Sequence, residues 1–248
     1  MYGVNVGNIS LATNTATPKS WSVWSLDLTG GIHKPKAKKI TDIPPAMLLN
    51  GMASLPAKPE KLLTADSIAG KIYFVDTKAE EYGVVSSASA LKPNASAVPP
   101  IGVNGIQFRP HDPDHLYFSN PTSPAFSRIR IHPEGGGQIG PVQAIEKPPI
   151  YHGDDFTFDA SGKYAYIAEG PVQTLLKLDI SKGRAKQVVG GLFSNALPGS
   201  TSCKFGRTKE DVAKGRLYIT TNGGLSGAPR SGIITGGKLF AVDTKKNS

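Results

Sequence analysis

The sequence predicts an all-β protein built as a β-propeller of four-stranded blades. Three observations predict this fold: short runs rich in β-branched and aromatic residues, turn residues that bound each run, and an order of runs that repeats at about 50 residues. The chain of 248 residues contains 28 glycines and 20 prolines, which favours many turns and short strands over long helices. Units of about four strands repeated at this period are typical of a propeller.

Four repeated units start near residues 45, 101, 151 and 200, and a partial unit fills 1–44. The first unit reads MLLNGMASL, KLLTADS, KIYFVDT and EYGVVSS, and the second reads IGVNGIQF, HLYFSNP, SRIRIHP and GPVQAIE. The third reads HGDDFTFD, YAYIAEG, LLKLDIS and AKQVVGG, and the fourth ends after STSCKFG, RLYITTN and KLFAVDT. We therefore expect a single propeller domain over 1–248.

The blade count follows from the incomplete units. Three units are complete, the last lacks a fourth strand, and the partial first unit lacks its first strand. Propellers close their ring by pairing strands from the two ends of the chain, which leaves no open edge. The pattern favours a six-bladed propeller that lacks about its first blade. A five-bladed closure and a ring completed by a second copy of the chain stay open as alternatives.

Two local motifs predict turns and a short helix. The third strand of most units ends in aspartate, at Asp27, Asp76, Asp179 and Asp243, which is typical of a strand that closes into a turn. The segment KEDVAKG, residues 209–215, predicts one helical turn at most.

Charge and composition exclude several classes of function. The net charge is +9, and part of it lies in residues 33–39, a loop bounded by Gly and Pro that contains no aromatic residue. This arrangement favours a solvated loop over a nucleic-acid surface. No apolar run is long enough to span a membrane. The N-terminus lacks the features of a signal peptide, while sequons at Asn8 and Asn94 leave the compartment open.

The single cysteine, Cys203, permits no internal disulfide and no cysteine-based metal cage. It lies in the strand-like run TSCKFG. We therefore expect a small buried strand residue here rather than a nucleophile.

The repeat brings polar residues to corresponding positions. In a propeller, the first strand of each blade begins at the channel mouth, and the second strand ends there. The strand beginnings carry Asn50, Asn104, Asp154 with Asp155 beside it, and Thr201-Ser202. The strand ends carry Asp66, Asn120, Glu169 and Asn222. We expect both sets to converge on one face of the molecule.

The Asn-Gly pairs at 50–51 and 104–105 have two interpretations. A single Asn-Gly is the commonest two-residue hairpin loop. Its recurrence in the same position of successive units, with Asp154 in the third, instead favours a functional ring. Converging amide and carboxylate oxygens suit a hard cation such as Ca²⁺ or Mg²⁺. The alternative is that these residues satisfy backbone groups around a water-filled channel.

One histidine, His152, lies close to the expected mouth, next to Tyr151 and Asp154. It is a candidate general base or hydrogen-bond donor to a substrate. A loop histidine without a role in mechanism is the alternative. No metalloprotease helix, phosphate-binding glycine loop or nucleophile elbow is present in the sequence.

The motifs LNGM, VNGI, GDDFTFD, TSCKFGRT and LYITTNGG resemble the regucalcin and gluconolactonase-like family, from about residue 45 to the end. The resemblance implies a six-bladed propeller with one divalent cation at the mouth, held by a Glu, two Asn and an Asp. The Asn pair maps onto Asn50 and Asn104, and the Asp onto Asp154, which is also implied as the base in lactone hydrolysis. The Glu would lie before Met1, so three of the family's four metal ligands have a counterpart in this sequence.

The segments SWSVWSLDL, DDFTFD and LYITTNGG further resemble a fungal branch of this family that contains hetero-Diels–Alderases of tropolonic sesquiterpenoid pathways. That resemblance implies small organic substrates: a quinone methide and a cyclic sesquiterpene alkene. The reaction needs no nucleophile and no cofactor, but a dry cavity and a donor to the quinone-methide carbonyl. Asn50, Asn104, Asp154 and Ser202 are then expected to line the pocket, with further substrate contacts from Asp66, Asn120 and Asn222. Tyr151 and His152 are the candidates for stacking and proton donation.

Two other classes of function stay open. One is a lactonase that depends on Ca²⁺ or Zn²⁺, with a fourth metal ligand from Asp66 or Glu169. The other is a propeller that binds partners without catalysis. The sequence does not identify the substrate.

Overall fold

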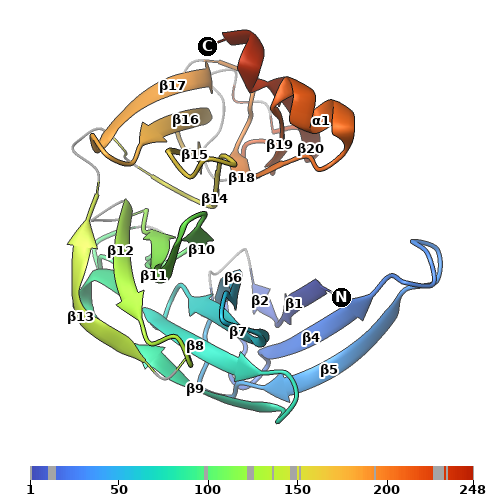
Figure 1. The fold of residues 1–248 in the computed structure, drawn as a ribbon, viewed down its shortest axis with the longest axis vertical. Coiled ribbons are helices and arrows are strands. Elements are labelled where there is room, and N and C mark those ends of the chain that lie inside the picture. Colours follow the sequence, from blue (N-terminus) through green and yellow to red (C-terminus); the bar gives the residue numbers. More distant parts are fainter. Residues whose placement is uncertain are drawn as a thin grey trace. The chain divides into compact units, whose positions relative to one another are not determined.

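The computed structural model describes residues 2–10, 15–97, 100–121, 126–135, 137–145, 150, 152–192, 194–225, 232 and 234–247. In these ranges the chain forms five blade sheets and a small hairpin, as Figure 1 shows. Three sheets have four strands and two have three. The predicted all-β propeller is confirmed at this level, while the six-bladed type and the missing first blade stay predictions.

The strands follow the predicted runs closely. The first sheet contains β1 (Tyr2–Val6), β4 (Ser22–Asp27) and β5 (Lys36–Asp42), with the hairpin β2 (Ile9–Ser10) and β3 (Thr15–Ala16) beside it in the chain. The second contains β6 (Leu49–Leu55), β7 (Lys58–Asp66), β8 (Lys71–Asp76) and β9 (Glu81–Ser86). The 3-10 helix η1 (Ser89–Leu91) follows β9.

The third sheet contains β10 (Ile106–Arg109), β11 (Asp112–Ser119), β12 (Phe126–Ile131) and β13 (Gln138–Ala144). The fourth contains β14 (Phe156–Phe158), β15 (Tyr164–Glu169), β16 (Thr174–Asp179) and β17 (Arg184–Gly190). The fifth contains β18 (Ser200–Phe205), β19 (Arg216–Thr221) and β20 (Lys238–Asp243), and η2 (Thr244–Asn247) follows it. In every sheet the strands lie in chain order.

The chain divides into two compact units. Unit 1 comprises Met1–Phe108, Asp112–Phe118 and Ile129–Val142, and unit 2 comprises Arg109–His111, Ser119–Arg128 and Gln143–Ser248. The single domain expected over 1–248 stays a prediction.

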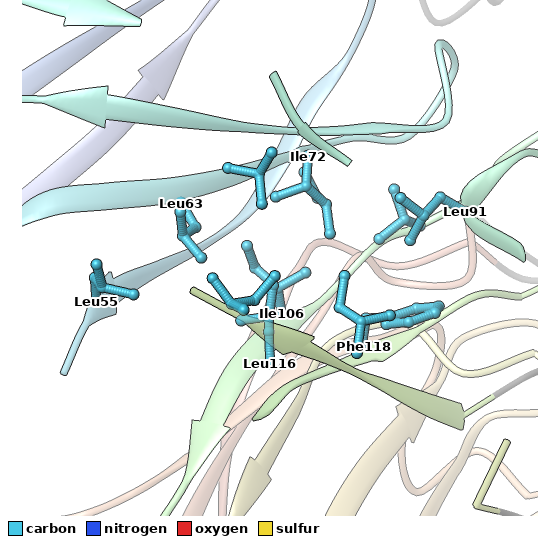
Figure 2. Packing of buried hydrophobic residues seen from close by; sticks show 12 residues of the cluster. Leu55, Leu63, Ile72, Leu91, Ile106, Leu116 and Phe118 are labelled. Carbon is cyan, nitrogen blue, oxygen red and sulfur yellow. The ribbon is translucent and has the colours of Figure 1, made fainter. Parts of the chain in front are cut away.

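The core of unit 1 is built from the apolar faces of successive strands. Leu63 and Ile72 come from β7 and β8, Leu91 from η1, and Ile106 and Phe118 from β10 and β11. Figure 2 shows these side chains facing one another across the gap between the two sheets. Burying a side chain of this size stabilises the fold by about 1.5–3 kcal/mol.

Unit 2 has a second core that reaches β18. Tyr166 and Leu175 pack with Cys203, Leu217 and Ile219, all of them buried. Two further rings, Phe126 and Phe156, meet edge to face with centroids 4.8 Å apart. Such aromatic pairs add about 0.5–1.5 kcal/mol beyond their buried area.

The strand-closing aspartates act as predicted at three of four positions. The Oδ1 atom of Asp76 accepts the backbone N–H groups of Lys78 and Ala79 at 2.9 and 3.0 Å. Asp27 and Asp179 accept backbone N–H groups of their own turns in the same way. Hydrogen bonds to the ionised form lower the pKa of all three carboxyls. Asp243 differs, because its Oδ1 accepts Arg216 Nε at 2.9 Å.

One helix is longer than predicted. The helix α1 (Lys209–Lys214) spans six residues, more than the single turn expected from KEDVAKG. A capping box explains the extra length: Thr208 Oγ1 accepts the Asp211 N–H, and the Asp211 carboxylate accepts the Thr208 N–H. Gly215, with φ of 59°, ends the helix in the left-handed conformation.

Candidate ligand site

The repeated polar positions, here called the slot residues, are Asn50, Asn104, Asp154 and Thr201. Asn50 is the second residue of β6, and Thr201 is the second residue of β18. Asn104 and Asp154 each lie two residues before the first strand of their sheets, β10 and β14. The strand pairing shifts register at two of these positions, between Leu49 and Met52 and between Ser200 and Ser202. A β-bulge at such a position re-aims side chains.

One backbone hydrogen bond recurs between slots and confirms their alignment. In unit 1 the N–H of Gly51, which follows Asn50, donates to the Asn104 carbonyl at 3.1 Å. In unit 2 the N–H of Asp155, which follows Asp154, donates to the Thr201 carbonyl at 3.2 Å. The slots of neighbouring sheets are therefore in direct backbone contact within each unit.

The glycine after Asn50 is required by this contact. A Cβ atom at Gly51 would lie 2.3 Å from the Asn104 carbonyl oxygen and 2.8 Å from the Ile106 nitrogen. Residues 104–105 do not form a hairpin tip, because the turn between β10 and β11 lies at residues 110–111. The hairpin interpretation of Asn104-Gly105 is therefore wrong, while the ring of polar residues stays a prediction.

Asn104 is the slot residue with the most distinctive environment. Its side chain is 6% exposed, and its Oδ1 atom is buried without a hydrogen-bond partner. Leaving a buried carbonyl oxygen unpaired costs about 1–3 kcal/mol. The oxygen therefore suits a group that binds from outside the chain, either a hydrogen-bond donor or a cation.

Asn50 differs from Asn104 because it is exposed. Its backbone carbonyl accepts a hydrogen bond from Asn5 Nδ2 at 2.7 Å, and the same nitrogen lies 3.0 Å from Thr64 Oγ1. Sequence reasoning missed Asn5. The available signal was a polar amide between Val4 and Val6 in β1, the same kind of interruption that marked Asn104.

In unit 2 the slot contains a second carboxyl group, that of Asp155, which accepts two hydrogen bonds. Asp155 Oδ2 accepts the Ser202 hydroxyl at 2.7 Å, and Asp155 Oδ1 accepts the Phe156 N–H at 2.8 Å. Burial raises the pKa of Asp155 and outweighs these two hydrogen bonds. The Asp154 backbone carbonyl accepts the Ser119 hydroxyl. The expected substrate contact Ser202 is therefore oriented by Asp155, which sequence reasoning noted only as a neighbour.

The strand-end residues hold the loops that lead into or out of the slots. Asp66 is fully buried, and its two oxygens accept the N–H groups of Met47, Leu48 and Ala69 at 2.9–3.1 Å. Asn222 Oδ1 accepts the N–H groups of Gly224 and Leu225. These contacts match the expected alternative in which polar residues satisfy backbone groups.

Glu169 and Asn120 complete this second set. Glu169 Oε1 accepts the backbone N–H of His152 at 3.1 Å, and the Glu169 side chain is 2% exposed. Asn120 is fully buried after β11. The roles of Asp66, Asn120 and Asn222 as substrate contacts stay predictions.

The two remaining catalytic candidates lie before β14. His152 is exposed, and its N–H is the group that Glu169 binds. Tyr151 lies outside the described residues. The expected stacking and proton donation by these two residues therefore stay predictions.

Cys203 is buried in β18, as expected, with its Sγ 3.2 Å from the Tyr166 carbonyl oxygen. Burial raises the pKa of the thiol well above its usual range. Because the thiolate is the reactive form, we expect native protein to resist a thiol reagent such as a disulfide dye at pH 8. Unfolding in urea should expose the group and release one equivalent of dye; rapid reaction in the native state would contradict this burial.

No cluster of three or more His, Cys, Asp or Glu side chains in the part of the chain that the structure describes could hold a metal ion. Among the same residues, no helix combines the length and apolarity that crossing a bilayer requires.

Two curated proteins are similar to the chain in sequence. A protein of Phoma sp. named "Putative hetero-Diels-Alderase" is 29% identical over 233 residues, which cover 85% of this chain and 63% of that protein. A second protein of the same description, from Sarocladium schorii, is 26% identical over 91% of this chain and 61% of its own length. The chain thus spans less than two thirds of these relatives. No family model matches the chain.

Solved structures with low sequence identity share the fold. A luciferin-regenerating enzyme superposes with a TM-score of 0.61 at 16% identity, covering 91% of this chain and 74% of that one. Regucalcin from Agrobacterium tumefaciens superposes with a TM-score of 0.55 at 16% identity, covering 88% of this chain and 67% of that one. A chain of a nidogen–laminin complex gives a TM-score of 0.62 at 16% identity, covering 99% and 73%. At such identities the likeness shows the fold alone.

Proposed function

We propose that this chain binds two small organic molecules at its slot residues and joins them in a hetero-Diels–Alder cycloaddition. The proposal rests on its regucalcin-like β-propeller fold and on curated relatives that are named as hetero-Diels-Alderases. The proposed partners are a quinone methide and a cyclic sesquiterpene alkene. The observation that carries the proposal is the sequence similarity over 85% of the chain, which includes the slot positions.

The proposed reaction depends more on how the two molecules are positioned than on acid, base or nucleophilic groups. The C=C–C=O unit of the quinone methide and the alkene exchange three π bonds for one π bond, one new C–C bond and one new C–O bond. No proton, electron pair or leaving group enters or leaves. Negative charge builds on the quinone-methide oxygen before the C–O bond is complete, so a preorganised donor to that oxygen lowers the barrier. Holding both molecules in a reactive arrangement lowers it further.

Each unit contains groups suited to this task. In unit 1 the Asn50 side chain is exposed and carries two N–H donors, while Asn104 contributes an acceptor that lacks a partner. In unit 2 the Ser202 hydroxyl is fixed by Asp155, and Asp154 lies one residue earlier. The Ser202 hydroxyl therefore has a defined orientation, which is the requirement for preorganisation.

The experiment is an assay of adduct formation with a quinone methide generated in solution and an excess of a cyclic polyene alcohol. We expect wild-type protein to accelerate formation of one stereoisomer. Asn50→Ala and Asp154→Ala should each slow it by about tenfold or more. Asn94→Ala is a matched control, because Asn94 is exposed, accepts the local Ser96 N–H and is not a slot residue. If both slot variants retain the rate and the stereochemistry, the slot assignment is wrong.

A second candidate, a lactonase that depends on a divalent cation, is favoured by one observation. The unpartnered Asn104 Oδ1 is an oxygen ligand of the kind that Ca²⁺ binds. A bound cation would polarise the lactone carbonyl, and Asn50, Asn104 and Asp154 are the residues proposed to hold it. Asp66 is less suited as a fourth ligand, because both of its oxygens already accept backbone N–H groups. Hydrolysis of an aldonolactone that a chelator abolishes would favour this candidate over cycloaddition.

A further inference from the structure

The peptide that joins Asn50 to Gly51 lies inside a β-bulge of the second sheet. The pairing of β6 with β7 jumps from Leu49 to Met52, so these two residues face the single residue Ala65. The extra residue of a bulge is left unpaired by the neighbouring strand. The C=O and N–H groups of this peptide therefore need partners outside their own pair of strands.

Both ends of this peptide have such partners in unit 1. The Asn50 carbonyl accepts Asn5 Nδ2 of β1 at 2.7 Å, and the Gly51 N–H donates to the Asn104 carbonyl at 3.1 Å. Asn5 is in turn held by the fully buried Thr64, whose Oγ1 lies 3.0 Å from Asn5 Nδ2 and 3.2 Å from Asn5 Oδ1. The peptide is therefore bound at its C=O end and at its N–H end.

The same arrangement recurs in unit 2, at the peptide that joins Asp154 to Asp155. The Asp154 N–H donates to the Ala168 carbonyl at 2.8 Å, and the Ala168 N–H donates to the Asp155 carbonyl at 3.0 Å, so two residues again face one. The Asp154 carbonyl accepts the Ser119 hydroxyl, and the Asp155 N–H donates to the Thr201 carbonyl at 3.2 Å. In both units a polar side chain from an earlier strand binds the C=O group, and the next slot binds the N–H group.

A peptide bound at both ends holds neighbouring slots at a fixed separation. Gly51 alone would allow the peptide before it to rotate, because glycine lacks the Cβ atom that restricts φ. The hydrogen bonds to Asn5 and Asn104 remove that freedom. A fixed separation matters for the proposed reaction, since two molecules react fastest when both are held in a near-attack arrangement.

We propose that Asn5 and Ser119 are positioning residues, which act on a ligand only through the slot peptides that they bind. Neither needs to contact the ligand, because the Asn5 amide is engaged by Asn50 and Thr64, and Ser119 is fully buried. The functional part of this proposal rests on the proposed cycloaddition. The amide protons of Gly51 and Asp155 test its structural part without any ligand.

The test in unit 1 is amide hydrogen exchange at Gly51, followed by NMR. Asn5→Asp keeps the shape of the side chain but replaces the donor with an oxygen that repels the Asn50 carbonyl. We expect the Gly51 N–H to exchange about tenfold faster. Asn8→Asp adds the same charge at an exposed residue whose described hydrogen bonds use its backbone, and exchange at Gly51 should stay within about twofold of wild type. Unchanged exchange in Asn5→Asp, or equal changes in both variants, would overturn the proposal.

The test in unit 2 is exchange of the Asp155 N–H in Ser119→Ala. Ser127→Ala is the matched control, because Ser127 is equally buried and its hydroxyl has no hydrogen-bond partner among the described residues. We expect faster exchange in Ser119→Ala and wild-type exchange in Ser127→Ala. Because the two units are tested separately, one variant that does not fold leaves the other to decide.

Adduct formation separates a positioning role from a merely structural one. At a temperature where all variants are folded, we expect Asn5→Asp and Ser119→Ala to lower kcat about tenfold, to leave KM unchanged and to reduce the excess of one stereoisomer. Faster exchange with an unchanged rate and product ratio, in an assay where Asn50→Ala slows the reaction, would overturn the positioning role. If wild type forms no adduct, the proposed function fails, while the exchange rates still decide whether Asn5 and Ser119 hold the slot peptides.

Discussion

Changing Gly51 to alanine should lower the free energy of unfolding by about 2–3 kcal/mol and the melting temperature by roughly 5–10 °C. The added Cβ would approach the Asn104 carbonyl oxygen to 2.3 Å and the Ile106 nitrogen to 2.8 Å. Both atoms belong to the backbone, so the clash cannot be relieved by rotating a side chain. The neighbouring slots must separate, and adduct formation should fall with them. Urea unfolding and thermal melting followed by circular dichroism measure the change.

Gly30→Ala is the control for this variant. A Cβ at Gly30 would meet only the Lys34 backbone oxygen and Cβ at 3.5 and 3.8 Å, which is ordinary contact. We expect its stability to match wild type within about 0.5 kcal/mol. Equal stability of the two variants would show that the contact between Asn50-Gly51 and Asn104 is not a close one.

Changing Asn104 to leucine should separate function from stability. The buried Oδ1 without a partner destabilises the fold, so an apolar side chain of similar size should raise the free energy of unfolding by about 1 kcal/mol. The same change removes the acceptor proposed to position the hydroxyl group of the polyene alcohol, and we expect adduct formation to fall about tenfold. Functional residues that cost stability in this way are common at binding sites.

The control for this second variant is Leu63→Ala in the core of unit 1. Leu63 is fully buried in a cluster of apolar residues, and its truncation should cost about 2–5 kcal/mol. If Asn104→Leu lost activity only because the protein unfolds, its free energy of unfolding would have to fall by an amount similar to that of Leu63→Ala. If Asn104→Leu is destabilised and still active, the proposed role of the Oδ1 atom is wrong.

Most of the fold was predictable from local patterns. The strands were readable because each run of β-formers, such as KIYFVDT at residues 71–77 or YAYIAEG at residues 164–170, is bounded by turn residues. The length of α1 was not readable, because the capping box at Thr208 and Asp211 depends on side-chain geometry that residue type alone does not fix. The number of blades also depends on pairing at the two ends of the chain, which no local pattern specifies.

The candidate site was predictable in its positions and less so in its contacts. The period of the repeat placed Asn50 and Asn104 at the start of neighbouring sheets, because it reports backbone register. It could not reveal that Gly51 packs on Asn104, since that contact lies between sheets. It also gave Asp66 a role as a ligand contact, whereas the structure engages both of its oxygens with backbone N–H groups. Asp155 was noted only as a neighbour because its hydrogen bond to Ser202 joins residues of different sheets.

The central claim, that the slot residues of this propeller promote a cycloaddition, is tested most directly by the stereochemistry of the adduct. Without protein, the reaction of a quinone methide with a cyclic polyene alcohol has no chiral influence beyond the alcohol. We predict that wild-type protein gives one stereoisomer in excess at a faster rate, and that Asn104→Leu returns the product mixture to the background ratio. The same ratio and rate with and without wild-type protein would contradict the account.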